Sequence, residues 1–377
     1  MPPQLLRPRD SATVGALVAQ TGDRAARTAR RHREPLGAAL GLALLACAGA
    51  CASVPGGEEI ASAPRAHALV VVIEQTPVAL TNRPWISAWV DAPFAFDELL
   101  PSWNTRLPAG GAFRVDVQLD AEDAPWLDLG GWGAWPASQR AATKFDLGRV
   151  AIDVVELDGD AERARVRIRT RGLAPGATAS LEHLTLCFTR SALHELRAGF
   201  GAPPPVATLP VPLRRQTDEG PEIAGRICSP TSVTMVLAFS GVERPTAEVA
   251  AALYDEEHDI YGNWNRAVQG AFGFGVPGEL VRIDDWPQAA AVLEQGTPLV
   301  ISIAAKEGQL SGAPYPSTDG HLLVLAGFDG EGHAVCFDPA VPPGDAAPRR
   351  YLLEELESIW LRRGGVAYRI GHASASR

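Results

Sequence analysis

The sequence predicts an α+β protein in which an antiparallel β-sandwich precedes a domain that begins with helices and ends with a sheet. Between residues 68 and 190, short apolar runs are separated by Pro, Gly and Asp, and several of them alternate in polarity as strands do. After residue 225, helical periodicity comes first and strand patterns follow. A chain of 377 residues is also long for a single core, so two domains and a leader are expected.

The expected boundaries lie where the composition breaks both periodicities. The tether and the linker are rich in Gly and Pro, and the linker contains the run 203–205 of three prolines. The expected parts are a leader at 1–52, a tether at 53–66, the sandwich at 67–198, a linker at 199–212 and the second domain at 213–373.

The first residues resemble an export signal. An Arg-rich segment is followed by the apolar run 36–46, which is too short to span a membrane as a mature helix. The run ends in Leu-Leu-Ala-Cys, which resembles the lipobox of bacterial lipoproteins and would make Cys47 the lipidated first residue. The alternative is plain secretion with cleavage after Ala50 or Ala52. Either route predicts an extracytoplasmic protein of the cell envelope, held to a membrane by the lipid anchor in the first case.

Composition bears on the partners. The net charge of -10 and the lack of a basic stripe interleaved with aromatic residues argue against nucleic acid. Metal and cofactor motifs are missing, so neither group is expected. In an oxidising compartment Cys187 and Cys336 could pair, but they fall in separate expected domains and in apolar strand patterns. Two buried free thiols are therefore predicted.

Tryptophans concentrate in the first domain, between residues 85 and 135. One interpretation is an exposed face that stacks on an envelope glycan or binds a protein, because an indole presents a large rigid apolar surface. The favoured alternative is that most of them fill the sandwich core. The six are Trp85, Trp89, Trp103, Trp126, Trp132 and Trp135.

The segment 225–240 contains the first candidate for chemistry. Its apolar residues recur at helical spacing, Pro230 suits a first helical turn, and Gly241 stands where a C-terminal cap belongs. Cys228 is thus expected at the N-terminus of a buried helix, where free amide hydrogens and the helix dipole favour a thiolate. The alternative is that Cys228 is a small buried hydrophobic residue.

Patterns along the chain predict the remaining elements. Strands of the first domain are expected at 69–73, 113–119, 150–157, 164–170 and 181–188. In the second domain, helices are expected at 246–254, 264–272, 286–295 and 352–360, and strands at 298–304, 321–328, 333–337 and 366–370.

A predicted hairpin brings two titratable groups together. If residues 330 and 331 form its two-residue loop, Asp338 lies opposite Leu323, on the face that His321 also occupies. Diagonal neighbours of this kind are about 7–8 Å apart, near enough for a carboxylate to orient an imidazole. His321 stands at the mouth of an otherwise apolar strand, where a site is expected, although a satisfied strand-end histidine is the simpler interpretation.

Short motifs in this part of the chain resemble those of a known family. They are Gln216, Gly-Arg at 225–226, Cys-Ser-Pro-Thr-Ser at 228–232, Gly-Asn-Trp at 262–264, Gly-His-Leu at 320–322, Gly-Phe at 327–328 and Asp-Pro at 338–339. Their order resembles that in bacterial papain-fold cysteine peptidases similar to the double-glycine leader peptidases, the thirty-ninth cysteine peptidase family. The resemblance covers about 210–372, and Pro-Ser-Trp-Asn at 101–104 resembles the N-terminal β-domain that accompanies this subgroup.

The resemblance implies a papain-like domain and a role for each matching residue. Cys228 would be the nucleophile, His321 the base and later the acid, and Asp338 the residue that orients the imidazole. Gln216 would donate its side-chain amide to the oxyanion.

Two departures concern the surroundings of the site. Ile227 stands where an aromatic residue is common in these relatives, and Phe337 where an asparagine often precedes the aspartate. Both leave the shape of the pocket open, but neither removes a catalytic group.

The leading hypothesis is an extracytoplasmic cysteine peptidase that hydrolyses a peptide or amide bond in a peptide or protein. The alternatives are an acyl transferase or deamidase with the same groups, and a non-catalytic envelope binding lipoprotein that uses the Trp-rich domain.

Overall fold

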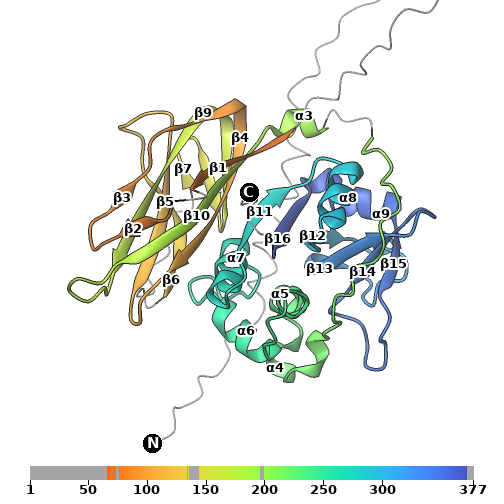
Figure 1. Cartoon of the computed structure of the whole chain (residues 1–377). Coiled ribbons are helices and arrows are strands. Elements are labelled where there is room, and N and C mark those ends of the chain that lie inside the picture. The colour runs from red at the N-terminus through yellow and green to blue at the C-terminus, as the bar shows by residue number, and fades with distance from the viewer. Residues whose placement is uncertain (1–65, 74–75, 134, 136–143, 196–198, 372–377) are drawn as a thin grey trace, which may run out of the picture. The chain divides into compact units, whose positions relative to one another are not determined.

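Two antiparallel sheets make up most of the structure (Figure 1). The computed structural model describes residues 66–73, 76–133, 135, 144–195 and 199–371. The expected leader with Cys47, and all of the expected tether except its last residue, lie outside this part of the chain. None of the described helices is both long and apolar enough to cross a membrane.

All the strands described before residue 190 belong to one hydrogen-bonded sheet, whose main path runs β1-β10-β4-β9-β5-β6. The strands are β1 (His67–Ile73), β2 (Val78–Leu80), β3 (Trp85–Ile86), β4 (Val90–Arg106), β5 (Ala112–Leu119), β6 (Leu127–Gly133), β7 (Lys144–Phe145), β8 (Gly148–Ala151), β9 (Val154–Arg171) and β10 (Ala179–Thr189). The short helix α3 (Ser191–Glu195) follows. The antiparallel strands are thus present, whereas the two separate facing sheets of the expected sandwich are not confirmed.

Two expectations for this sheet are corrected. The strand predicted at 150–157 is two strands, because Ile152 has a φ of 62° and turns the chain between β8 and β9. The prediction also lacked the 17-residue strand β4. Pro93 and Pro101 interrupt the pattern of β4, and most of its second half is buried on both faces, so polarity does not alternate there.

The six tryptophans divide into two groups. Trp103 is buried in the core of the N-terminal sheet, and Trp85 and Trp132 pack against that core. The other three stack on arginines of β9. The guanidinium of Arg165, for example, lies 4.5 Å from the ring centroid of Trp89 and 5.4 Å from that of Trp126. Core burial was therefore correct for only part of the set, because cation–π stacking holds the rest on a half-buried face.

The second half of the described chain places its first helices before its sheet, as predicted. The helices are η3 (Gln216–Asp218), α4 (Pro221–Ala224), α5 (Cys228–Phe239), α6 (Thr246–Leu253), α7 (Trp264–Gly273), α8 (Trp286–Glu294), α9 (Leu353–Ile359) and η4 (Leu361–Arg363). The strands are β11 (Gly278–Arg282), β12 (Leu299–Ala305), β13 (Thr318–Phe328), β14 (His333–Phe337), β15 (Arg349–Leu352) and β16 (Val366–Ile370). Their order in the sheet is β11-β16-β12-β13-β14-β15.

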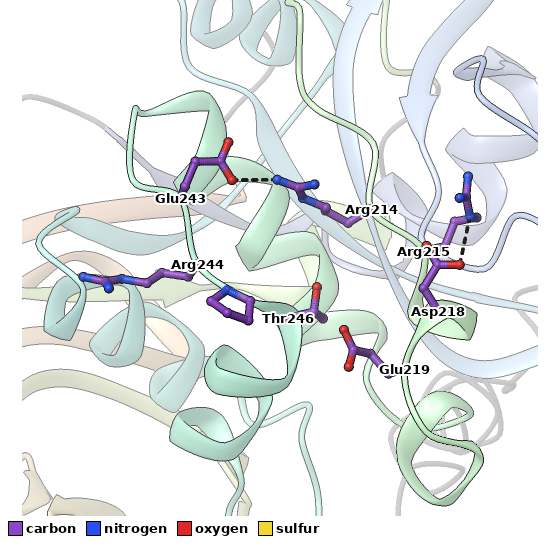
Figure 2. A pocket seen from close by; sticks show the side chains of 8 residues that line it. Arg214, Arg215, Asp218, Glu219, Glu243, Arg244 and Thr246 are labelled. Atoms are coloured by element: carbon purple, nitrogen blue, oxygen red, sulfur yellow. Dashed lines mark hydrogen bonds and ion pairs between the residues drawn. The ribbon is translucent and has the colours of Figure 1, made fainter.

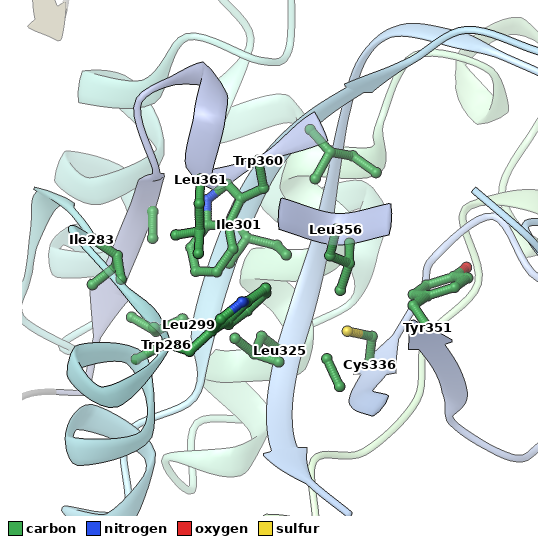
Figure 3. Close-up of a cluster of buried hydrophobic side chains, with 14 of the residues drawn as sticks. Ile283, Trp286, Leu299, Ile301, Leu325, Cys336, Tyr351, Leu356, Trp360 and Leu361 are labelled. Carbon is green, nitrogen blue, oxygen red and sulfur yellow. The ribbon is translucent and has the colours of Figure 1, made fainter. Parts of the chain in front are cut away.

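Both faces of this C-terminal sheet are covered. Successive side chains of a strand point to opposite faces, so Leu323 packs in the cluster with Trp286 and Trp360, whereas Leu322 packs in the cluster with the α5 residue Val236. Figure 3 shows the first of these clusters. In it the ring centroids of Trp286 and Trp360 are 5.6 Å apart. Because α5 packs on β13, the N-terminus of this helix is held beside the start of that strand.

Candidate active site

Cys228 is the first residue of α5, the position that the sequence predicted. The first turn of α5 is closed by a hydrogen bond from the Thr231 N–H to the Ile227 carbonyl at 2.9 Å. Burial raises the pKa of Cys228, but the hydrogen bond and charge of His321, together with the backbone amides of Leu322 and Ser229, outweigh that effect. The pKa of the thiol is therefore lowered, which favours the nucleophilic thiolate.

His321 lies on β13 and is only 5% exposed. Its Nε2 is 2.8 Å from Oδ1 of Asp338, and the hydrogen bond to Cys228 acts on the same imidazole. Burial lowers the pKa of His321. The carboxylate of Asp338 and the thiolate of Cys228 raise it by a larger amount, so the net shift is upward. The structure thus brings together the three groups that the sequence analysis singled out.

The hairpin places Asp338 as expected, although its turn differs. Near the turn Phe328 pairs with Ala334, which is one residue out of the predicted register. A bulge between Leu325 and Gly327 restores that register, so Val324 pairs with Phe337 and Asp338 follows on the expected face. The longer turn shifts the strand register by one residue and the bulge shifts it back, so the pairing beside the site is the predicted one.

The carboxylate of Asp338 is fully buried and accepts four hydrogen bonds. Oδ1 accepts from His321 and from the Ala340 N–H at 2.9 Å. Oδ2 accepts from the hydroxyls of Tyr351 at 2.8 Å and Tyr315 at 3.1 Å. Burial raises the pKa of Asp338, but the charge of His321 and these donors lower it overall, so the carboxylate stays ionised. Neither tyrosine was singled out by sequence, because neither belongs to a motif.

Gln216 begins η3 and is tied to the residue after Asp338. Its backbone N–H donates to the Pro339 carbonyl at 2.8 Å. Its side-chain Oε1 is buried and has no hydrogen-bond partner among the described residues. This amide oxygen is therefore not committed to a structural contact.

A charged pocket of about 470 Å³ lies beside the same turn (Figure 2). It is lined by Arg214, Arg215, Asp218, Glu219, Glu243, Arg244, Pro245 and Thr246, and thus by none of the three groups above. Arg214 bonds Glu243 at 2.6 Å, and Arg215 bonds Asp218 at 3.2 Å. Because the lining holds three arginines and three acidic residues, it does not select strongly for one sign of charge.

The other described cysteines are free and buried, as predicted. Burial raises the pKa of Cys187 to about 11 and that of Cys336 well above its usual range. Within the described residues, no group of three or more His, Cys, Asp or Glu side chains could hold a metal ion.

Comparisons with known proteins match both halves of the chain. Residues 208–368 match the model described as the Peptidase_C39 like family, and residues 73–188 match the Peptidase C39 N-terminal domain. A search of curated proteins found no match. Among solved structures, a double glycine motif protease from an AMS/PCAT transporter, in complex with the leader peptide, is 21% identical. That match has a TM-score of 0.30 and covers 44% of this chain and 96% of the other.

Proposed function

We propose that this chain, a cysteine peptidase-like hydrolase whose residues 208–368 form a C39-like region, cleaves a peptide or amide bond through Cys228, His321 and Asp338. One observation carries the proposal. A cysteine with a lowered pKa at a helix N-terminus shares a buried histidine with a fully buried carboxylate. A papain-like fold of the C-terminal half is part of the same proposal, and its support is the α5 helix packed on an antiparallel sheet.

The geometry supports a two-stage reaction. The Cys228 thiolate attacks the carbonyl carbon, and the protonated His321 donates its proton to the leaving amine. Water then attacks the acyl-enzyme while His321 accepts a proton from it, and Cys228 leaves as the thiolate. Asp338 holds the imidazole in one orientation throughout. The side-chain amide of Gln216 and the backbone N–H of Cys228 are the proposed donors to the oxyanion.

The first test is the rate at which iodoacetamide alkylates Cys228 between pH 4 and pH 10, with the modified cysteine identified by mass spectrometry. We expect Cys228 to react at lower pH than a free thiol does, because the lowered pKa leaves more of it as the thiolate. The buried Cys187 and Cys336 are internal controls that should stay unmodified.

The His321→Ala variant should shift the profile of Cys228 upward, toward the behaviour of a free thiol at about pH 8.5. A wild-type protein that already behaves as a free thiol would contradict the proposal. Fluorogenic peptide mixtures then test hydrolysis, and added amines show whether the acyl group is transferred instead of hydrolysed.

We further propose that the protein acts in the cell envelope and that Cys47 carries a lipid anchor. The support is the apolar run ending in Leu-Leu-Ala-Cys. Cys47→Ser should move the protein from the detergent phase of a membrane extract to the aqueous phase, whereas Cys51→Ser should leave it in the detergent phase. If the wild type is aqueous and its mature N-terminus follows Ala50 or Ala52, plain secretion replaces this proposal.

A further inference from the structure

Tyr315 contacts both members of the His321–Asp338 pair. Its hydroxyl donates to Oδ2 of Asp338 at 3.1 Å, and its ring centroid lies 4.8 Å from that of His321 at an interplanar angle of 61°. The residue comes from the loop between β12 and β13, between Pro314 and Pro316. One side chain therefore contacts both the carboxylate and the imidazole.

Tyr351 provides a natural comparison. It donates to the same oxygen of Asp338, at 2.8 Å, but it does so from β15. Its ring is 1% exposed and packs in the cluster that also holds Cys336 and Leu356 (Figure 3). The two tyrosines thus donate to the same oxygen from different elements, and the described ring contact with His321 belongs to Tyr315.

The loop that carries Tyr315 is anchored at a distance from the site. Ser311 donates to Glu355 of α9 through its backbone N–H at 2.9 Å and through its hydroxyl at 2.6 Å. Leu310 is buried beside this anchor. Gly308 and Gly312 have φ values of 78° and 75°, which the turns of this loop require. The loop that carries Tyr315 is therefore held by contacts outside the site.

We propose that Tyr315 is a positioning residue of this site, whose ring holds the His321 imidazole in line between Cys228 and Asp338. The inference rests on the proposed function. An imidazole held by hydrogen bonds to Asp338 and Cys228 can still tilt about the line that joins these two partners, and an aromatic ring packed against it at 61° restricts that tilt. The hydroxyl of Tyr315 anchors the ring on the carboxylate that the imidazole also bonds.

The experiment compares Tyr315→Leu, Tyr315→Phe and Tyr351→Phe in the intact chain. The readout is the pH profile of Cys228 alkylation by iodoacetamide, and thermal unfolding confirms that each variant is folded. Each Phe variant removes one hydroxyl that donates to Oδ2 of Asp338 and keeps the aromatic ring. The two variants should therefore have similar alkylation profiles. Tyr315→Leu removes the ring as well, and we expect a profile about one pH unit higher and a rate at pH 6 about tenfold lower.

A fourth variant acts at a distance. Glu355→Ala removes the anchor of the loop without touching the site, and it should shift the profile in the same direction by a smaller amount. If Tyr315→Phe keeps most of the Cys228 reactivity that Tyr315→Leu loses, the ring of residue 315 and not its hydroxyl carries the effect.

The outcomes separate this inference from the proposed function. If wild-type Cys228 reacts as a free thiol, the proposed function fails, and the inference fails with it. If the wild type has the expected low-pH profile but Tyr315→Leu is no worse than Tyr351→Phe, the positioning role is overturned and the proposed function stands. A Tyr315→Phe variant as impaired as Tyr315→Leu would also overturn the role assigned to the ring.

Discussion

The hydroxyl oxygen of Ser102 accepts a hydrogen bond from the backbone N–H of Leu280 at 2.9 Å, although the two residues lie in different sheets. Two further backbone amides of β11 also donate to side chains of the N-terminal sheet. Asn104 accepts from Gly278 at 3.2 Å, and the N–H of Arg282 bonds the sulfur of Cys187. Because β11 is an edge strand of the C-terminal sheet, side chains of β4 and β10 satisfy amides that the edge would otherwise leave open.

Removing one of these acceptors should destabilise the protein. Ser102→Ala leaves the buried N–H of Leu280 without its acceptor and also removes the 2.6 Å hydrogen bond between the Ser102 and Thr185 hydroxyls, so we expect a loss of about 1–3 kcal/mol in the free energy of unfolding. Thr105→Val is the matched control in the same strand, because the buried hydroxyl of Thr105 has no described partner. Urea denaturation of both variants is the measurement. Equal losses would mean that the Leu280 bond contributes nothing specific.

Deleting residues 1–198 should leave an insoluble or associating fragment. The deletion exposes the amides of β11 and the face that β4 covers, and an open edge strand pairs with other chains. Size-exclusion chromatography of the fragment beside the full chain is the measurement. A monomeric fragment whose Cys228 alkylation profile matches that of the full chain would show that the C-terminal half folds alone.

Local patterns predicted most of the C-terminal half, because its elements follow simple periods. The strands 333–337 and 366–370 have the predicted bounds, and α5 begins at the predicted cysteine. Long-range contacts were beyond these patterns. β11 is a short strand buried throughout, so it shows no alternation that would separate it from a loop.

The candidate site was predictable where the residues occur in motifs or in the hairpin register. His321 and Asp338 meet because the predicted register holds beside the site, where the bulge between Leu325 and Gly327 compensates for a turn one residue longer than predicted. Tyr315 and Tyr351 come from a loop and an edge strand that no short-range pattern connects to the site. Single-strand patterns could not separate the core tryptophans from the other three, because they do not reveal that Arg side chains from β9 stack on those three.

Asp338→Asn should narrow the pH range in which Cys228 is activated. The charge of Asp338 raises the pKa of His321 against its burial, so a neutral amide lets that pKa fall. His321 then loses its proton at lower pH, and the alkaline limb of the thiolate–imidazolium state moves down. The measurement is the alkylation rate of Cys228 from pH 5 to pH 10 with a neutral and an anionic alkylating agent, because the anionic agent responds to the imidazolium charge. An unchanged alkaline limb would contradict the assigned role.

Asp153 should make the folded protein less stable as the pH rises toward neutrality. Its carboxyl lies in the turn between β8 and β9 and accepts from the backbone N–H of Trp264 at 2.7 Å, at the start of α7. Burial raises its pKa from 3.8 to about 7, against the lowering effect of that hydrogen bond. Between these values the unfolded chain loses a proton that the native state keeps, so stability falls over that range and is constant above it.

Asp153→Asn keeps an oxygen acceptor for Trp264 and cannot ionise. From pH 5 to pH 8 we expect the stability of Asp153→Asn relative to the wild type to rise by up to about 3 kcal/mol, because about two of the roughly three pH units between the two pKa values lie above pH 5. Asp153→Ala is the control, because it also removes the acceptor and should cost about 1–3 kcal/mol at pH 5. Urea unfolding at the two pH values tests both variants. If Asp153→Asn and the wild type lose stability in parallel between pH 5 and pH 8, the pH dependence does not come from Asp153.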